Sequence, residues 1–254
     1  MAFKQHTGKG MVPDDSSSMA AQWEAVWADC EQNLEDLEQS TTWALLQSHL
    51  PQGGRILEAG CGTGQWVRLL ASKGYNAYGI DFSERTVRAS KTKWPDLELV
   101  VGDLRSMPYQ DGFFDGVMSL GAVEHDVQGP SAALAEMYRV LRSGGILFCT
   151  VPCHNIARHL GAFALKDWAR RNRWLRRLKG YNYDSVFWQY LWTPREYAQI
   201  LTNSGFEVIR LVPLELRKSL LTPPQSFKAR IIRCIQKHYP WFTPHMIAGI
   251  CRKP

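Results

Sequence analysis

From Arg55 to Val151 the chain alternates between short apolar runs and longer amphipathic stretches. A short apolar run bounded by turn residues is typical of a buried strand, and apolar positions spaced three and four residues apart are typical of a helix. The runs predict strands over residues 55–59, 76–80, 97–101, 114–120 and 146–151. The stretches between them predict helices over residues 65–73, from Ser83 onward, and over 131–141. This βαβ alternation predicts a mostly parallel sheet with helices on both faces.

The region before the first of these strands has the pattern of a helix. Trp23 and Trp27 recur at helical spacing with acidic residues around them, so one or two helices are expected over residues 20–50. Residues 1–18 are polar and lack the apolar stretch of a secretory signal, which favours a mobile tail. Residues 19–254 are then expected to form a single domain.

After the fifth strand the alternation is interrupted twice. Inserts are expected over residues 153–192 and 214–244, around a helix over 193–204 and strands over 206–211 and 246–251. The helix has proline at its first position, where proline is favourable. The last two strands have no room for a parallel crossover unless the second insert supplies it, so the final strand is expected to run antiparallel.

Composition narrows the class of protein. The chain has 254 residues, of which 45% are hydrophobic and 21% charged. This usage is ordinary for a globular domain and excludes a fibrous or disordered chain. No apolar run approaches the roughly 18–20 residues that a membrane-spanning helix needs. Six scattered cysteines without a C-x-x-C pair or zinc-ligand spacing favour reduced thiols in a cytoplasmic protein, with no metal site.

The charge is divided unevenly along the chain. Residues 1–154 hold 12 Lys/Arg against 19 Asp/Glu, a net charge of −7. Residues 155–254 hold 18 against 5, a net charge of +13, so the two parts sum to the total of +6. This asymmetry favours an anionic ligand or surface near the C-terminal part. The alternative is that the basic residues only solvate helices, and the sequence leaves both open.

The strongest motif is the glycine-rich stretch from Glu58 to Gly64, Glu-Ala-Gly-Cys-Gly-Thr-Gly, between a predicted strand and a predicted helix. Glycines at such a turn let the backbone bend sharply and approach a ligand, and the helix start points backbone N–H groups toward it. Dinucleotide-binding folds use a similar turn. Their third glycine would fall at position 65, where this chain has Gln65, while its own third glycine comes one residue earlier.

Two further acids lie at predicted strand ends. Asp81 closes the second strand, where a carboxylate can accept hydrogen bonds from both ribose hydroxyls of a nucleoside. Asp103 lies just past the third strand, where an acid can accept a hydrogen bond from an adenine amino group. Open α/β sheets bind ligands at this carboxyl edge. One nucleoside across three neighbouring strand ends is therefore expected, although each acid alone could instead cap a helix.

Together these motifs resemble those of class I S-adenosylmethionine-dependent methyltransferases, over about residues 55–151 with a looser likeness in 193–211 and 246–252. The resemblance implies an α/β, Rossmann-like, seven-stranded sheet in the order 3-2-1-4-5-7-6, with strand seven antiparallel and a helical insert after strand five. It implies S-adenosyl-L-methionine as the cofactor. Glu124-His125 is similar to the acid–His pair that often follows strand four in the small-molecule branch, which includes quinone-biosynthesis methyltransferases.

The resemblance also assigns roles to single residues. The cofactor-binding residues that it implies are Glu58, Gly60, Cys61, Gly62, Gly64, Asp81, Phe82, Asp103, Leu104 and Leu120. Hydroxyl and carbon nucleophiles need a base, for which His125, after strand four, and His154, after strand five, are the catalytic candidates. A structural hydrogen bond or a helix cap is the alternative for each. A covalent role for Cys153 is disfavoured because nothing around it matches the cytosine methyltransferases that use such a residue.

The insert over 153–192 contains a basic, amphipathic segment, 164–178, followed by many aromatic residues. Such a segment can lie on an anionic membrane surface, cover the substrate as a lid, or simply pack on the domain. The aromatic residues suit an apolar substrate cavity or core packing. Nucleic acid is an unlikely partner because no recognition module is present. Oligomeric state is not readable from the sequence.

These observations predict a cytoplasmic methyltransferase that acts on a small-molecule or lipid-linked acceptor. In one alternative the protein also lies at the membrane surface, and in one alternative the acceptor is anionic. Two rivals remain. One is a nicotinamide-dependent Rossmann oxidoreductase, which Gln65 and the Asp103 motif disfavour. The other is a non-catalytic protein that binds S-adenosylmethionine.

Overall fold

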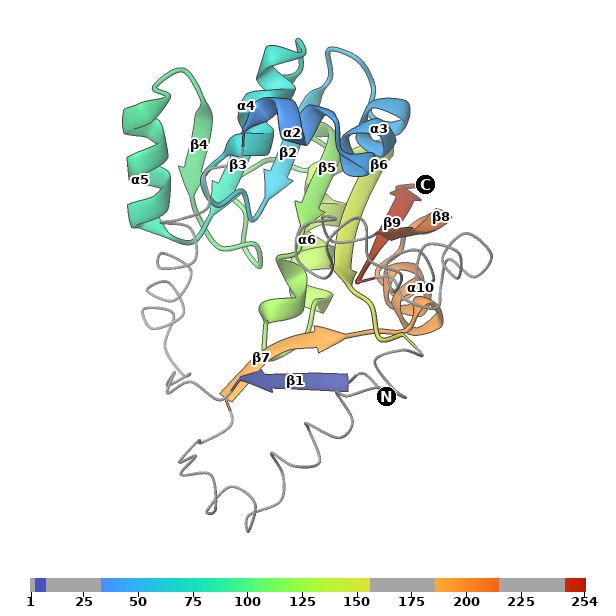
Figure 1. Cartoon of the computed structure of the whole chain (residues 1–254). Coiled ribbons are helices and arrows are strands. Elements are labelled where there is room, and N and C mark those ends of the chain that lie inside the picture. Colours follow the sequence, from blue (N-terminus) through green and yellow to red (C-terminus); the bar gives the residue numbers. More distant parts are fainter. Residues whose placement is uncertain (1–2, 8–32, 156–185, 215–244) are drawn as a thin grey trace, which may run out of the picture.

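The computed structural model describes residues 3–7, 33–155, 186–214 and 245–254. Its centre is a seven-stranded sheet in the order β4-β3-β2-β5-β6-β9-β8. The pairs from β4 to β6 are parallel, and β9 runs antiparallel to both of its neighbours. Figure 1 shows these strands side by side with their parallel members pointing the same way. The predicted α/β class, strand order and antiparallel seventh strand are confirmed.

The strands of this sheet lie close to where the apolar runs place them. Their bounds are β2 Arg55–Ala59, β3 Asn76–Asp81, β4 Glu98–Val101, β5 Phe114–Leu120, β6 Leu141–Pro152, β8 Glu207–Leu214 and β9 Met246–Arg252. The largest difference is β6, which begins five residues before the predicted start at residue 146. The helix predicted over residues 131–141 ends at Val140, and the strand begins directly after it, so Gly144 and Gly145 lie within the extended segment.

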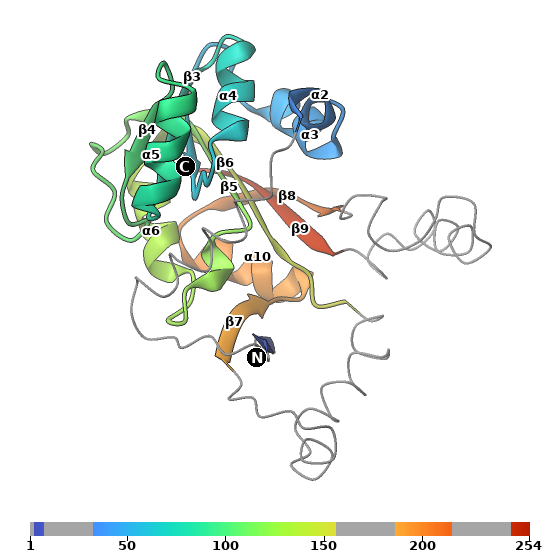
Figure 2. The same ribbon diagram turned by 60° about the vertical axis from the view of Figure 1, so that its left-hand side comes forward.

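Helices cover both faces of the sheet (Figures 1 and 2). Their bounds are α2 Leu34–Glu38, α3 Thr41–His49, α4 Gln65–Ser72, α5 Glu84–Lys93, α6 Ser131–Val140 and α10 Pro194–Asn203. One apolar core packs α6 and α10 against the sheet. A second packs α2, α3, α4 and α5 against the opposite face. In the part of the chain that is described, no helix is long and apolar enough to cross a membrane.

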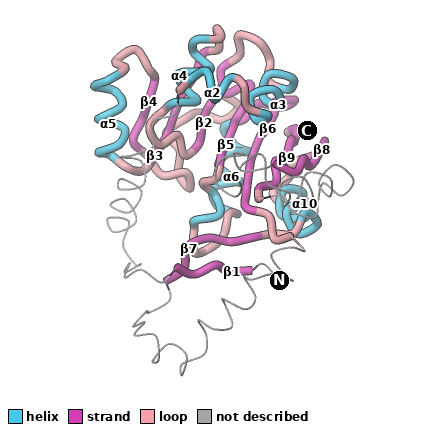
Figure 3. The backbone as a smooth tube through the Cα atoms, viewed as in Figure 1, coloured by secondary structure: helices cyan, strands magenta, loops and turns pink. Residues whose placement is uncertain are grey.

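A separate two-stranded sheet was not anticipated. β1, Phe3–Thr7, pairs antiparallel with β7, Val186–Leu191. Figure 3 shows this pair beyond the ends of the central strands, next to the α6 region. Residues 3–7 of the predicted tail thus form a strand that pairs with a segment about 180 residues later, and the mobility of the tail stays a prediction. The rest of the tail, the helix predicted around Trp23 and Trp27, and most of both predicted inserts lie outside the described residues.

The turn between β2 and α4 is built from glycine in left-handed conformations. Gly60, Gly62 and Gly64 have φ values of 84°, 50° and 71°. A Cβ atom added at Gly60 would lie 2.5 Å from the Cβ atom of Ala122, in the turn after β5. Only glycine fits both requirements at this position. The turn therefore brings the ends of β2 and β5 into direct contact.

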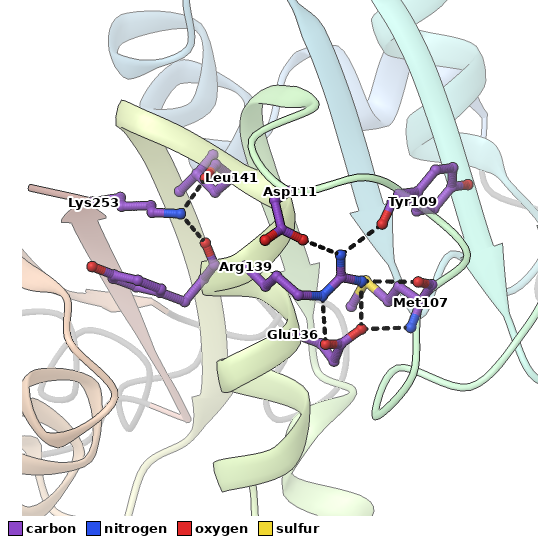
Figure 4. Close-up of polar contacts among 8 residues, drawn as sticks. Met107, Tyr109, Asp111, Glu136, Arg139, Leu141 and Lys253 are labelled. Carbon is purple, nitrogen blue, oxygen red and sulfur yellow. Dashed lines mark hydrogen bonds and ion pairs between the residues drawn. The ribbon is translucent and has the colours of Figure 1, made fainter.

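A single arginine fixes the loop after β4 (Figure 4). The guanidinium of Arg139 on α6 donates to both carboxylate oxygens of Glu136 at 2.7 and 2.8 Å and to Asp111 at 2.8 Å. It also donates to the backbone carbonyls of Met107 and Tyr109 at 3.0 and 2.7 Å. Glu136 in turn accepts from the backbone N–H of Met107. This network anchors residues 107–111 on α6 and so holds in place the preceding segment with Asp103.

We predict that Arg139→Met lowers the free energy of unfolding by about 2–4 kcal/mol, because two carbonyls and the Glu136 carboxylate lose a charged donor. Urea denaturation measures this change. Arg88→Met is the matched control, since Arg88 pairs with Glu84 one turn away on an exposed helix surface. Its cost is expected to stay below about 0.5 kcal/mol. Equal costs for the two variants would contradict an anchoring role for Arg139.

We also predict that Gly60→Ala is more destabilising than Gly53→Ala. Both glycines have positive φ, 84° and 69°, so alanine is strained at each. Only Gly60 faces a neighbour, because nothing lies within 4 Å of a Cβ atom built at Gly53. The overlap with Ala122 should add about 1–3 kcal/mol to the shared backbone cost. Urea unfolding of both variants tests the difference, and a smaller loss for Gly60→Ala would show that the turn has room.

Candidate functional site

Acidic residues follow the carboxyl edge of the sheet from strand to strand. Glu58 lies in β2, Asp81 ends β3, Asp103 follows β4, and Glu124 follows β5 in a 3-10 helix, η1, Val123–His125. Because β4, β3, β2 and β5 are adjacent in that order, the acids follow the same order along one edge. This edge is where open α/β sheets bind ligands.

Asp81 links the glycine turn to the neighbouring strand. It is 5% exposed, and its carboxylate accepts hydrogen bonds from the backbone N–H of Gly62 at 2.8 Å and of Ser83 at 3.0 Å. Burial raises the pKa of Asp81, and these N–H donors partly oppose the rise. The carboxylate therefore stabilises the turn itself, besides facing any ligand at this edge.

Glu58 has an oxygen atom without a partner. The residue is 3% exposed, and its Oε2 atom makes no hydrogen bond. Burial raises the pKa of Glu58 well above its usual value, the nearby Asp81 charge raises it further, and the backbone N–H of Val67 lowers it. A buried carboxyl oxygen without a partner is costly, so this position suits a hydrogen-bonding cation from a ligand.

The glycine turn does not form a phosphate cradle. The N–H groups of Gly60 and Cys61 donate to the carbonyl of Ile80 at 2.8 and 3.0 Å, and that of Gly62 donates to Asp81. A pyrophosphate needs such donors free, and the neighbouring Asp81 carboxylate would repel it. The geometry therefore disfavours a dinucleotide and favours a ligand with a cationic end.

The thiol of Cys61 does not have the environment of a ligand contact. Cys61 is buried within the core that covers the α4 face, where a Cβ atom built at Gly79 would lie 2.9 Å from its Sγ atom. Burial and the Glu58 and Asp81 charges raise the thiol pKa. Any contribution of Cys61 to a ligand site comes from its backbone position in the turn.

Asp103 is not a free acceptor in the structure. Its side chain is 48% exposed and forms a two-pronged pair with the guanidinium of Arg105, which also lies 3.8 Å from Asp126. The hydrogen bond from Arg105 lowers the pKa of Asp103. The ion pair between Asp103 and Arg105 was not predicted from the sequence, although an Asp-x-Arg sequence at a strand end is a recognisable signal for one. A role of Asp103 toward adenine stays a prediction.

Three apolar residues assigned to the site surround the same edge. Phe82, directly after Asp81, is 37% exposed, which is unusual for a phenylalanine. Leu104 lies 3.8 Å from the Cβ position of Gly60, so the loop after β4 reaches the glycine turn. Leu120, at the end of β5, packs partly against the core on the α4 face. These positions are compatible with contacts to a flat, apolar ring.

The two histidines lie at neighbouring strand ends. His125 is in η1, where its Nε2 atom is 3.8 Å from Oε1 of Glu124. His154 follows β6, and its backbone N–H donates to the carbonyl of Trp192 at 2.8 Å. Glu124, which the sequence marked only as part of the acid–His pair, is 2% exposed. The described residues place both histidines at the carboxyl edge and leave their catalytic roles as predictions.

The central part of the chain is similar to known methyltransferases. Residues 57–149 match a family model described as a methyltransferase domain. The demethylmenaquinone methyltransferase of Staphylococcus epidermidis is 35% identical over 127 residues, which cover 46% of this chain and 52% of that protein. The chain thus spans about half the length of this curated relative.

Solved structures show the same fold. A S-adenosylmethionine-dependent methyltransferase of Methanosarcina mazei aligns with a TM-score of 0.58 and 20% identity, covering 82% of this chain and 96% of that one. SpnF, named as a 4+2 cyclase, aligns with a TM-score of 0.56 and 20% identity, covering 84% and 79%. Residues 57–149, which hold the glycine turn and its acids, are therefore similar to methyltransferase domains, and the solved structures share the fold.

Proposed function

We propose that this protein binds S-adenosylmethionine at the carboxyl edge of its sheet and transfers the methyl group to a small-molecule or lipid-linked acceptor. The observation that supports this most is the buried, unpartnered Oε2 atom of Glu58 beside a glycine turn whose N–H groups at residues 60–62 are already paired. The cofactor carries an ammonium and a sulfonium, both cationic, and such a site suits them better than a phosphate.

The residues present fit the cofactor in the order of the strands. Glu58 would accept from the ammonium group, Asp81 from the ribose hydroxyls, and the loop with Asp103 and Leu104 would lie at the adenine, with Phe82 beside it. A carboxylate accepts about four hydrogen bonds, and that of Asp81 already accepts from the backbone N–H groups of Gly62, Ser83 and Phe82, so the ribose hydroxyls would share its remaining acceptor capacity. Asp103 would have to share its carboxylate between Arg105 and the adenine amino group.

The protein's part in the reaction is mainly alignment. When bound, the cofactor supplies a methyl group on a positively charged sulfur, which is a good leaving group. The chain would hold the cofactor through its strand ends and the glycine turn, and this positioning can supply much of the rate. Where the acceptor is a hydroxyl or carbon acid, a base at the ends of β5 and β6 must take a proton. His125 and His154 are the candidates from the sequence.

The acceptor class rests on similarity to relatives named demethylmenaquinone methyltransferases, which supports a small or lipid-linked molecule. The basic, aromatic insert that suggested a lid or a contact with an anionic membrane lies mostly outside the described residues, so both stay predictions from sequence. A non-catalytic binding protein is the rival that the geometry leaves open. Nicotinamide binding is disfavoured by the paired turn, and a fluorescence titration with reduced nicotinamide dinucleotide would test it.

Isothermal titration with S-adenosylmethionine and its demethylated product should show binding of both. Asp81→Ala is expected to weaken binding by about 2–4 kcal/mol, because a charge-assisted pair of acceptors is lost. Asp96→Ala, an exposed acid before β4, is the control and should bind like the wild type. Absence of binding by the wild type would contradict the proposed function, and unchanged affinity in Asp81→Ala would remove Asp81 from the site.

Binding should also release protons at pH values above the usual pKa of a glutamic acid. Because its pKa is raised, the Glu58 carboxyl keeps its proton to higher pH in the free protein than an ordinary glutamic acid does, and an ammonium group placed against it favours the ionised form. Titrations in two buffers of different ionisation enthalpy count the protons released. Glu58→Gln, which cannot ionise, should remove this release and weaken binding. Proton release that persists in Glu58→Gln would assign it to another group.

A further inference from the structure

A second buried carboxyl group at the same edge is unused by the proposed cofactor site. Glu124 is 2% exposed, and its Oε2 atom has no hydrogen-bond partner. A polar atom in this state destabilises the fold, because it has lost its water without gaining a protein partner. Such a group is expected where function requires it. Glu58 and Glu124 share this feature, and they lie at the ends of adjacent strands β2 and β5.

The order of the strands places Glu124 on the acceptor side. If adenine lies at β4, ribose at β3 and the ammonium at β2, the next position along the edge is the end of β5. There Ala122 touches the glycine turn, and two residues later comes Glu124. On the far side, η1 lies against β7, and the hydroxyl of Tyr190 donates to the carbonyl of Val127 at 2.8 Å. The segment from Ala122 to Val127, which includes Glu124, therefore contacts the glycine turn at one end and β7 at the other.

The groups that face Glu124 leave its carboxyl group without a fixed positive partner. On its own element, Nε2 of His125 lies 3.8 Å from Oε1, beyond hydrogen-bond distance. Cys149 of β6 and Tyr197 of α10 interact electrostatically with Glu124, whose charge raises the pKa of both groups, and both are buried and neutral at ordinary pH. Burial raises the pKa of Glu124 to about 8. A base works best when its pKa lies near the operating pH.

We propose that Glu124 is the catalytic base of the acceptor site: its Oε2 atom receives the hydrogen bond of a hydroxyl or amino group on the methyl acceptor and takes the proton that this group loses. This inference rests on the proposed function. The acceptor atom forms the new bond to the methyl carbon, the carbon–sulfur bond breaks with its electron pair left on sulfur, and the proton moves from the acceptor to the ionised carboxylate. The acceptor class is thus one that presents an O–H or N–H group at its reacting end.

The first test measures stability and needs no acceptor. Glu124→Met keeps the length of the side chain and removes the unpartnered carboxyl group, so its thermal unfolding midpoint should rise above that of the wild type. Glu124→Gln should remove a pH dependence: the wild type should lose stability relative to this variant as pH rises from 4.5 toward 8, because the fold favours the protonated acid. A lower midpoint for Glu124→Met would show a structural role and overturn the inference.

The second test measures turnover as release of S-adenosylhomocysteine with a panel of phenols, enols and amines. The wild-type rate should rise with pH through about 8. In Glu124→Gln, kcat should fall roughly 100-fold and the rate should no longer rise with pH. The cofactor affinity of this variant should stay within about twofold of the wild type. Tyr109→Phe is the matched control, because it removes another buried polar atom without a partner, on the loop after β4 and outside the residues assigned to the acceptor site, and should leave turnover unchanged.

The outcomes separate this inference from the proposed function. Wild-type protein that fails to bind S-adenosylmethionine would contradict the proposed function itself. Wild-type binding together with full turnover and an unaltered pH profile in Glu124→Gln would overturn only the role of Glu124. His125→Asn distinguishes the remaining base at this turn, since loss of the pH-dependent rise in that variant alone would assign the proton to His125.

Discussion

The hydrogen bond from the Gly62 N–H to the buried carboxylate of Asp81 is the constraint on which the candidate site depends. It joins the turn after β2 to the end of β3 across the parallel pair. The same carboxylate accepts from Ser83, which caps α5. Two helix starts and two strand ends are thereby fixed by one buried acid. A charged acceptor gains more from such bonds than a neutral one, and in a water-poor interior the gain is larger.

Three buried carboxyl groups at one edge of the sheet reduce the stability of the fold. Asp81 is satisfied by backbone donors, whereas Glu58 and Glu124 each keep one oxygen without a partner. Burial raises the pKa of all three. A fold selected for stability alone would place apolar side chains at the latter two positions. Their presence at one edge of the sheet supports the proposed binding and catalytic roles there, while the two apolar cores supply stability.

The sequence predicted the central sheet well because its signals are local. Runs such as 55–59 and 114–120 carry their own periodicity and turn residues, and the structure has strands at the same bounds. The strand order came from the family resemblance. β1 could not be predicted from the local pattern, because residues 3–7 form a strand only by pairing with a distant segment around residue 190. The burial of Glu124 likewise depends on β6 and β7, which the sequence does not place around it.

The fold by itself does not fix the reaction, since a protein named as a cyclase shares it. What distinguishes this chain is the chemistry at each strand end. The N–H groups of residues 60–62 are already paired and so are not available as donors to a phosphate, whereas the unpartnered oxygen of Glu58 can accept a hydrogen bond from a cationic group. Once the cofactor's charged end is placed at β2, the strand order leaves only the ends of β5 and β6 for its reacting partner. The proposed cofactor contacts and the proposed acceptor side therefore both rest on the acids at the strand ends.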